Sequence, residues 1–255
     1  MEAHKVVSRD EWLAARKAHL ADEKALTRAR DALGSKRRAL PWVKVDKPYV
    51  FDGPGGKETL GGLFGTKSQL IVYHFMLGPD WEEGCPSCSL LADHFDGAAV
   101  HVAQRDVAFV VVSRAPLRQI EKFKSRMGWR FKWVSSFGND FNFDYHVSAT
   151  PEEKATGVAT YNYEETEFPG EERPGASVFY RDAAGDVFHT YSSYGRGLDI
   201  FIGAYNFLDI VPKGRDEDGL NFTMAWVRHH DKYEGAVVDA EATYREPKSS
   251  PSCCD

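Results

Sequence analysis

Two short apolar runs, at residues 68–77 and 106–113, constrain the possible folds of this chain more than any other feature. Each has the length and composition of a buried strand, and each is followed by a stretch with helical periodicity, at 85–105 and 116–128. Strands that are apolar throughout are buried on both faces, and strands joined through a helix run parallel. The order therefore predicts a β-α-β-α unit whose sheet is covered by helices.

An antiparallel hairpin is predicted further along the chain. The sequences ASVFYRD and DVFHTYSSY flank a turn at 183–185, and the apolar stretch 198–211 that follows is predicted to be a helix. At the other end, Ser8 and Glu11 form the pattern of a capping box that begins a helix of about 25 residues, ending near Gly34. The expected class is α/β, a mixed sheet flanked by helices, with an N-terminal helix and a C-terminal extension.

The same patterns divide the chain into four parts. Residues 1–45 are expected to form a helical extension, and residues 46–213 the main domain. Within that domain, residues from about 138 to 173 show no clear period and are expected to be an irregular insertion. Residues 214–245 form a C-terminal extension, and residues 246–255 are expected to be a disordered tail.

Composition excludes several classes of protein. With 255 residues, 42% of them hydrophobic, the chain can bury a full core, and its four cysteines are too few for a secreted disulfide scaffold. The first residues lack the pattern of a signal peptide, so we expect a reducing, cytoplasmic setting. No run approaches the ~18 apolar residues of a membrane span. The net charge of −6 argues against a nucleic-acid partner.

Cys85 and Cys88 lie where the first buried strand gives way to a helix. Pro86 suits the first helical position, and a spacing of one helical turn brings the two sulfurs within bonding reach. The positive end of the helix dipole favours a thiolate at Cys85, while Cys88 faces inward, from where it can attack a mixed disulfide. Carboxylates at Glu82 and Glu83 oppose the thiolate. The pattern predicts a thiol-disulfide couple in which Cys85 attacks and Cys88 resolves.

The chain resembles the thioredoxin-like superfamily over roughly residues 46 to 210. The resemblance is carried by FDGPGGKETLGGLFG with LIVYHF, by C-P-S-C between strand and helix, and by the hairpin SVFYRDAAGDVFHTY, in the usual order. It implies a thioredoxin-like mixed sheet. Two features depart from the pattern. GPDWEEG is inserted before the cysteines, and the cis proline expected near Ala176 is missing, since Pro174 lies two residues early.

More narrowly, four motifs resemble a bacterial thioredoxin-like family of unknown function: GCPSCS, FHTYSSYGRG, YNFLDIVPKGRDE and WVRHHDKYE. This narrower resemblance spans nearly the whole chain. It implies the same fold and brings no established substrate with it.

In a thioredoxin-like sheet, the motif HTYSSYGRG returns the chain to the edge that carries the cysteines. Tyr194 and Arg196 are then expected to line the cleft, and with Pro86 they are the candidate substrate-binding residues. The Arg196 guanidinium could offset the nearby carboxylates or hold an anionic substrate. The alternative is that Gly195 and Gly197 simply turn the chain, while Arg196 pairs on the surface.

A metal site is another interpretation of the cysteine pair. Zinc would need two more ligands. The remaining candidates either lie at unsuitable spacing or, being consecutive, point in different directions; they are His74, His94, His101, His229, His230 and Asp231. We therefore expect no metal. Cys253 and Cys254 form a second pair in the tail, which could exchange disulfides or bind metal.

Two further functions are weighed against redox exchange. Peroxiredoxins carry Thr or Ser three residues before the attacking cysteine, where this chain has Glu82, so a peroxidase is disfavoured. A non-catalytic thioredoxin-fold module could bind a partner through Tyr161, Tyr163 and Phe168. The favoured interpretation is a thiol-disulfide oxidoreductase that needs no bound cofactor and that acts on a disulfide substrate with an external electron donor.

Overall fold

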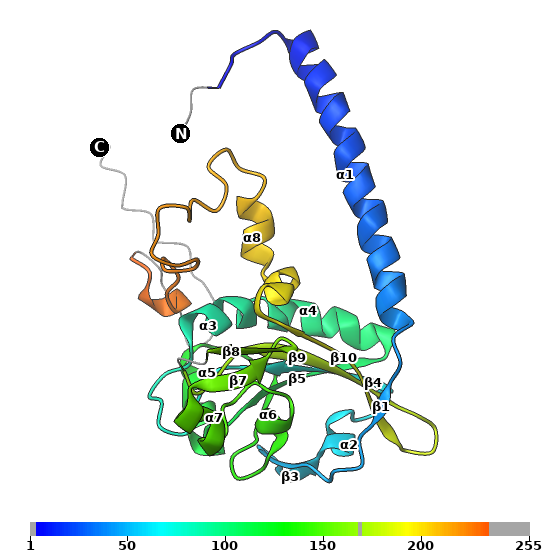
Figure 1. Ribbon diagram of the computed structural model, residues 1–255, viewed down its shortest axis with the longest axis vertical. Coiled ribbons are helices and arrows are strands. Elements are labelled where there is room, and N and C mark those ends of the chain that lie inside the picture. The colour runs from blue at the N-terminus through cyan, green and yellow to red at the C-terminus, as the bar shows by residue number, and fades with distance from the viewer. Residues whose placement is uncertain (1–3, 168–169, 235–255) are drawn as a thin grey trace, which may run out of the picture. The chain divides into compact units, whose positions relative to one another are not determined.

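The computed structural model describes residues 4–167 and 170–234 of the chain (Figure 1). One compact unit ends at Trp42 and another begins at Val43. The predicted tail with Cys253 and Cys254 lies outside the described residues, as does Phe168.

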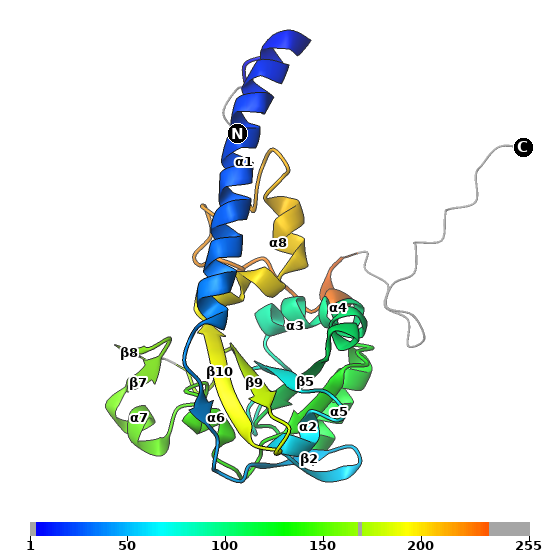
Figure 2. The same ribbon diagram turned by 90° about the vertical axis from the view of Figure 1, so that its right-hand side faces the viewer.

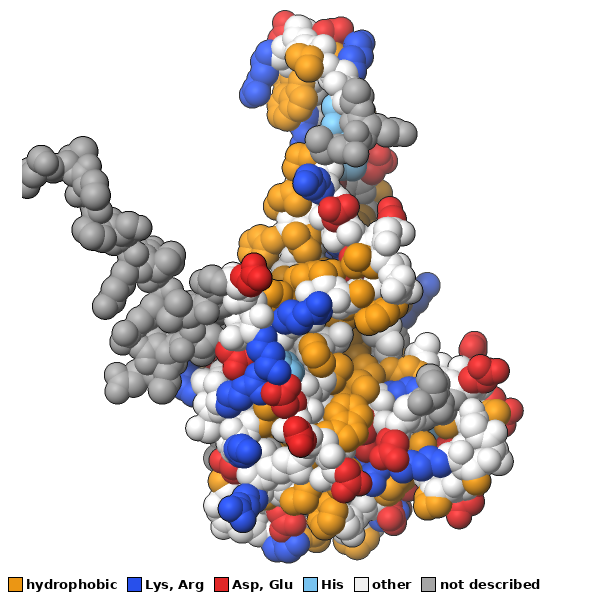
Figure 3. All heavy atoms as spheres, turned by 90° about the vertical axis from the view of Figure 1, so that its left-hand side faces the viewer, with side chains coloured by type: hydrophobic (Ala, Val, Ile, Leu, Met, Phe, Trp, Pro, Cys, Tyr) orange, Lys and Arg blue, Asp and Glu red, His pale blue; other side chains and the backbone are white. Residues whose placement is uncertain are grey.

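Helix α1 (Arg9–Arg38) is the regular element of the first unit. It begins at the predicted capping box, in which Ser8 N donates to Glu11 Oε2 (3.0 Å) and Glu11 N donates to Ser8 Oγ (3.3 Å). It continues past Gly34, where the sequence predicted its end, because the basic residues that follow suit the negative end of the helix dipole. None of its described side chains is buried, and hydrophobic side chains lie exposed along it (Figure 3).

Eight strands among the described residues form one sheet, in the order β1-β10-β9-β4-β5-β6-β2-β3. At its centre, β4 (Gln69–His74) pairs in parallel with β5 (Val107–Ser113) and antiparallel with β9 (Gly175–Arg181). β6 (Lys132–Ser135) runs parallel to β5, and β10 (Val187–Tyr194) runs antiparallel to β9. The outer strands are β1 (Val43–Lys44), β2 (Val50–Gly53) and β3 (Gly56–Thr59). The order β10-β9-β4-β5, with these directions, is that of a thioredoxin-like fold, so the predicted fold class is confirmed (Figure 2).

Side chains of β4 alternate between two cores, one on each face of the sheet. Tyr73 packs among residues of α3, α4 and α5, whereas Val72 packs among residues of α2 and α6. Successive side chains of a strand point to opposite faces, so one short apolar run supplies both cores. The helices of this unit are α2 (Leu60–Leu63), α3 (Pro86–Ala92), α4 (Phe95–Val102), α5 (Leu117–Arg126), α6 (Phe141–Asp144), α7 (Pro151–Thr156) and α8 (Gly203–Leu208). Over the described residues, no helix combines the length and apolar character that a membrane span requires.

Three segments differ from the sequence-based expectation. The helix expected over 85–105 is broken between α3 and α4, where the His94 ring bonds to the Leu90 carbonyl (2.7 Å) and accepts from Ala204 N (3.1 Å). The helix expected over 198–211 is a 3-10 turn, Gly195–Phe201, followed by the short α8. The insertion at about 138–173 holds α6, α7 and a separate two-stranded sheet, β7 (Val158–Tyr161) with β8 (Glu164–Glu167).

Candidate functional site

Strand β4, the loop after it and α3 place the cysteine pair. Cys85 N donates to Met76 O (3.0 Å), which joins the two ends of the loop that the sequence marked as an insertion. Pro86 then starts α3, a position where a missing N–H costs nothing. Ser89 donates to the Cys85 carbonyl through both its N–H and its hydroxyl, each at 2.9 Å. The backbone around Cys85 is thus fixed from both sides.

The two cysteines are free thiols in different surroundings. Cys85 is partly exposed, whereas Cys88 is 2% exposed. The Cys88 thiol donates a hydrogen bond to the Cys85 sulfur, and with the N–H groups of Cys88 and Ser87 it lowers the pKa of Cys85 to about 7, although burial opposes this. Burial raises the pKa of Cys88 well above its usual value, and the adjacent Cys85 sulfur raises it further. Near neutral pH a substantial share of the Cys85 thiol is therefore ionised, while the buried Cys88 keeps its proton.

Tyr73 lies beneath Cys88. Its side chain is 1% exposed, and its hydroxyl has no ordinary hydrogen-bond partner among the described residues. Burial raises the pKa of Tyr73, and the Cys88 thiol, which interacts with this hydroxyl, raises it further. The same interaction lowers the pKa of Cys88. A buried hydroxyl without another partner is uncommon, so its place beside the inner cysteine calls for a functional explanation.

Ion pairs neutralise Glu83, one of the carboxylates expected to oppose the thiolate. Its oxygens bond to Lys232 Nζ (2.7 Å) and to Arg126 Nη1 (2.5 Å). The hydrogen bond from Lys232, followed by the one from Arg126, lowers the pKa of Glu83. The sequence predicted that the negative charge of Glu83 would disfavour a thiolate at Cys85. Two cations from distant parts of the chain offset that charge.

Residues 229–231 attach the C-terminal segment to the cysteine helix. His229 Nε2 bonds to the carbonyl oxygen of Gly84 (2.8 Å), and His230 Nδ1 bonds to Asp93 Oδ1 (2.6 Å). Asp231 accepts two bonds from the Arg126 guanidinium, at 2.7 and 2.9 Å. These three side chains are thus hydrogen-bonded to other groups of the protein. Within residues 4–167 and 170–234 there is no cluster of three His, Cys, Asp or Glu residues placed to bind a metal. The sequence did not reveal this attachment.

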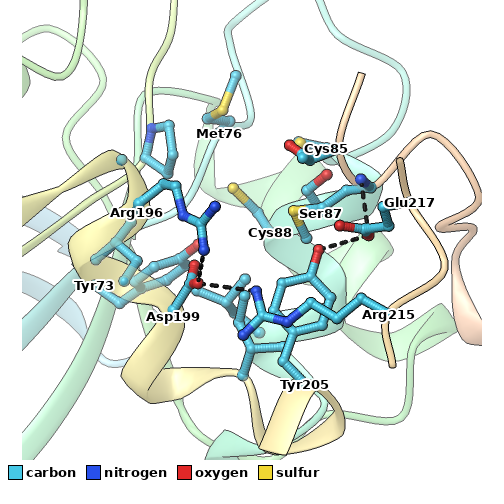
Figure 4. A pocket seen from close by; sticks show the side chains of 17 residues that line it. Tyr73, Met76, Cys85, Ser87, Cys88, Arg196, Asp199, Tyr205, Arg215 and Glu217 are labelled. Carbon is cyan, nitrogen blue, oxygen red and sulfur yellow. Dashed lines mark hydrogen bonds and ion pairs between the residues drawn. The ribbon is translucent and has the colours of Figure 1, made fainter. Parts of the chain in front are cut away.

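A cavity of about 270 Å³ opens beside the two sulfurs (Figure 4). Apolar residues make up one part of its lining, namely Met76, Leu91, Leu198, Ile202 and Met224. Charged residues from the segment after the hairpin make up another, namely Arg196, Asp199, Arg215 and Glu217. Cys88 and Ser87 lie near the middle of the view, with Arg196 on one side and Glu217 on the other (Figure 4).

Pro174 also lines this cavity, directly before β9 begins at Gly175. The sequence placed the expected proline position near Ala176, and β9 begins one residue before it, so that Pro174 is the residue that directly precedes the strand. No cis peptide bond occurs among the described residues. Tyr161 bonds to the Pro174 carbonyl (2.7 Å) and accepts from Gly195 N (2.9 Å), so the insertion supports this side of the cavity.

The structure separates the three candidate substrate-binding residues. Arg196 lines the cysteine cavity, as expected. Tyr194 faces another cavity, where its hydroxyl donates to the Tyr145 carbonyl (3.1 Å). Pro86 is exposed at the start of α3 and is not among the described residues that line the cysteine cavity. Tyr163, proposed for a binding module, donates to the Ser192 carbonyl (2.9 Å).

Of the other candidate histidines, His74 is buried in the core and His101 is exposed. His74 is 1% exposed and its Nε2 bonds to Ser177 Oγ (2.9 Å), within a chain of hydrogen bonds that reaches Ser192 and His189. Burial lowers the pKa of His74 to about 3, so its imidazole is neutral. His101 lies near the end of α4.

Comparison with known proteins gives a family and several distant structures. A family model described as "Bacterial protein of unknown function (DUF899)" matches residues 1–233. No curated protein matches the chain. Peroxiredoxin Q of Xanthomonas campestris is 11% identical, with a TM-score of 0.41, covering 64% of this chain and 94% of its own. PrxQ of Xylella fastidiosa is 13% identical, with a TM-score of 0.40, covering 65% and 95%. Peroxidoxin BcpB of Mycobacterium tuberculosis is 14% identical, with a TM-score of 0.39, covering 64% and 94%.

Proposed function

The chain belongs to this family of bacterial proteins of unknown function, and we propose that it is a thiol-disulfide oxidoreductase in which Cys85 attacks and Cys88 resolves. One observation carries the proposal. Two free thiols at the edge of a cavity have opposite pKa shifts, lowered at the accessible Cys85 and raised at the buried Cys88. A pair that forms, breaks and re-forms a disulfide in a fixed order needs this asymmetry.

In the first step, the Cys85 thiolate attacks one sulfur of a substrate disulfide. The new bond joins Cys85 to that sulfur, the substrate S–S bond breaks, and the departing thiolate takes a proton from water. Hydrogen bonds from the Cys88 thiol and from Ser87 stabilise the Cys85 thiolate before attack. A pKa near ambient pH suits an attacking thiol, because a less basic thiolate is also a weaker nucleophile.

In the second step, Cys88 attacks the Cys85 sulfur, and its proton ends on the departing substrate sulfur. A Cys85–Cys88 disulfide forms, the second substrate thiolate leaves, and two electrons have passed to the substrate. Formation of the mixed disulfide removes the Cys85 charge, one of the causes that raise the pKa of Cys88. The Tyr73 hydroxyl can donate a hydrogen bond to the Cys88 thiolate as it forms. The order of the two steps is thus set by the pair itself.

A complete cycle needs an electron donor outside this chain, which we propose to be a dithiol that reduces the Cys85–Cys88 disulfide by the same two steps in reverse. A cytoplasmic location, proposed on the low cysteine content, would supply such reductants.

The test is a redox titration of the pair. Protein carrying Cys253→Ser and Cys254→Ser, which leaves Cys85 and Cys88 as its two cysteines, would be equilibrated in a series of glutathione buffers and then alkylated. We expect both thiols to disappear together in a single two-electron transition, seen by mass. A further Cys85→Ser or Cys88→Ser change should abolish it. Absence of the transition, or stoichiometric zinc that is lost on changing Cys85, would contradict the proposal.

A further inference from the structure

The cavity wall opposite the cysteines is held in place by its own ion pairs. Arg215 bonds to Asp209 through two parallel hydrogen bonds, of 2.7 and 2.8 Å, and to Asp199 Oδ2 (3.1 Å). Its guanidinium lies 3.8 Å from the centre of the Tyr205 ring. Paired hydrogen bonds of this kind fix direction as well as distance. Arg215 is thus engaged in holding the wall together.

Glu217 secures the next part of the same wall. Its Oε1 accepts from the Tyr205 hydroxyl (2.8 Å), from Trp226 Nε1 (2.6 Å) and from Met224 N (3.0 Å). The segment between the hairpin and Trp226 is therefore tied to itself at several points beside the cysteines. The part of a substrate that enters this cavity beside Cys85 has to fit a volume of about 270 Å³, just below the usual range of ligand sites.

Arg196 differs from the other charged residues of the wall. Its side chain is 80% exposed, and in the described structure it makes one hydrogen bond, from Nη2 to Asp199 Oδ2 (3.0 Å). That carboxylate is shared with Arg215. A guanidinium has five N–H donors, so Arg196 keeps donors for a further oxyanion without breaking its bond to Asp199. Its place in the lining puts such an oxyanion in the same cavity as Cys85.

We infer that the substrate is a low-molecular-weight disulfide that carries a carboxylate, of the kind formed by amino acids or short peptides. This inference rests on the proposed thiol-disulfide exchange and specifies what it acts on. The carboxylate binds Arg196, the carbon skeleton packs against Met76 and Leu198, and the disulfide lies at Cys85. Arg196 acts here by binding: the groups that chiefly lower the pKa of Cys85 are Cys88 and Ser87.

The test compares three disulfides on the pre-reduced full-length protein. They are oxidised glutathione, which carries carboxylates, 2-hydroxyethyl disulfide, which is neutral, and insulin, which is a protein. The second-order rate constant of Cys85 consumption is measured for each by acid quench and mass spectrometry. We expect wild-type protein to react faster with oxidised glutathione than with the other two. Arg196→Gln should slow that reaction roughly tenfold or more, the loss expected for a charge-assisted hydrogen bond, and change the neutral reaction less than about twofold.

Arg130→Gln is the matched control, because Arg130 is 85% exposed and is not among the described residues that line the cavity. It should alter none of the three rates. Equal slowing of the charged and neutral reactions by Arg196→Gln, or insulin as the fastest substrate, would overturn the inference while leaving thiol-disulfide exchange intact. A wild-type protein that reacts with none of the three would overturn the proposed function as well.

Discussion

His229 and Gly84 are 145 residues apart along the chain, yet the His229 imidazole bonds through Nε2 to the Gly84 carbonyl at 2.8 Å. Gly84 directly precedes Cys85. The C-terminal segment is therefore part of the support of the cysteine pair, and not an appendage to a domain that is complete without it.

Loss of this bond should loosen the cysteine region. His229→Ala removes a 3% exposed ring and leaves the Gly84 carbonyl without this partner, which should cost about 1–3 kcal/mol of unfolding free energy. We expect a lower denaturation midpoint and faster alkylation of Cys85 by iodoacetamide under native conditions. His19→Ala is the control, because His19 is 67% exposed on α1. If the two variants behaved alike, the His229–Gly84 bond would have no supporting role.

Reactivity of Cys85 should follow the titration of its own thiol. The pKa of Cys85 is lowered, so its thiolate is populated above about 7, and alkylation should rise with pH through that value. Cys88→Ala removes the thiol donor and should move the curve upward toward the usual cysteine range, slowing alkylation at neutral pH roughly tenfold or more. Cys88→Ser keeps a hydrogen-bond donor, so its curve should lie between those of the wild type and Cys88→Ala. Each curve is measured by the alkylation rate and by the ultraviolet absorbance of the thiolate. Overlapping curves for all three proteins would show that the Cys88 thiol does not lower the pKa of Cys85.

Tyr73→Phe should slow the second chemical step and spare the first. Without the hydroxyl, the Cys88 thiolate loses the donor that Tyr73 supplies, so a mixed disulfide between Cys85 and glutathione should accumulate, visible by mass. Stability should change by less than about 1 kcal/mol, because the hydroxyl has no other hydrogen-bond partner to lose in the described structure. Tyr49→Phe, whose hydroxyl bonds to Asp144 away from the cysteines, controls for loss of a buried hydroxyl. Unchanged kinetics in Tyr73→Phe would leave that residue a packing group.

A side chain at Gly84 should be poorly tolerated. A Cβ there would lie 2.5 Å from a Phe75 ring carbon and 2.6 Å from a Phe123 ring carbon, and such overpacking costs about 1–3 kcal/mol. Gly84→Ala should therefore lower the urea midpoint. Gly97→Ala is the matched control, since its Cβ meets nothing within 4 Å and replacing a helical glycine stabilises by about 0.5–1 kcal/mol. Equal stability of the two variants would show that the Phe75 ring can move aside.

The parts of the fold that the sequence predicted are those with strong local signals. The runs at 68–77 and 106–113 are apolar throughout, so β4 and β5 were predicted near their observed bounds, and the position of Cys85 followed from them. Strand β6 has four residues and was missed, because so short a run shows no period. The helix expected over 198–211 is interrupted at Ile202, whose backbone is not helical (φ −95°, ψ 86°), next to Gly203, where a Cβ would lie 2.7 Å from the His94 ring.

The site was predicted where it depends on neighbouring residues and missed where it depends on distant ones. The sequence predicted that Cys85 and Cys88 would lie one helical turn apart and that Arg196 would return to their edge of the sheet, and the three residues do line one cavity. Tyr194 was misplaced because the direction of a side chain at the end of a strand depends on register. The contacts of His229 and Asp231 could not be foreseen, because a buried histidine that bonds to a distant carbonyl leaves no mark in the local sequence.

The bond from Cys85 N to Met76 O bears on how such a chain can vary. It closes residues 77–84 into a loop that leaves the end of β4 and returns to the same point. The cysteines are therefore placed by the two ends of the loop and not by the number of residues within it. Because the entropy of closing a loop grows slowly with its length, residues added beside the exposed Asp80 should cost little closure entropy. The approach to the cysteine pair can thus change in length while Cys85 keeps its place.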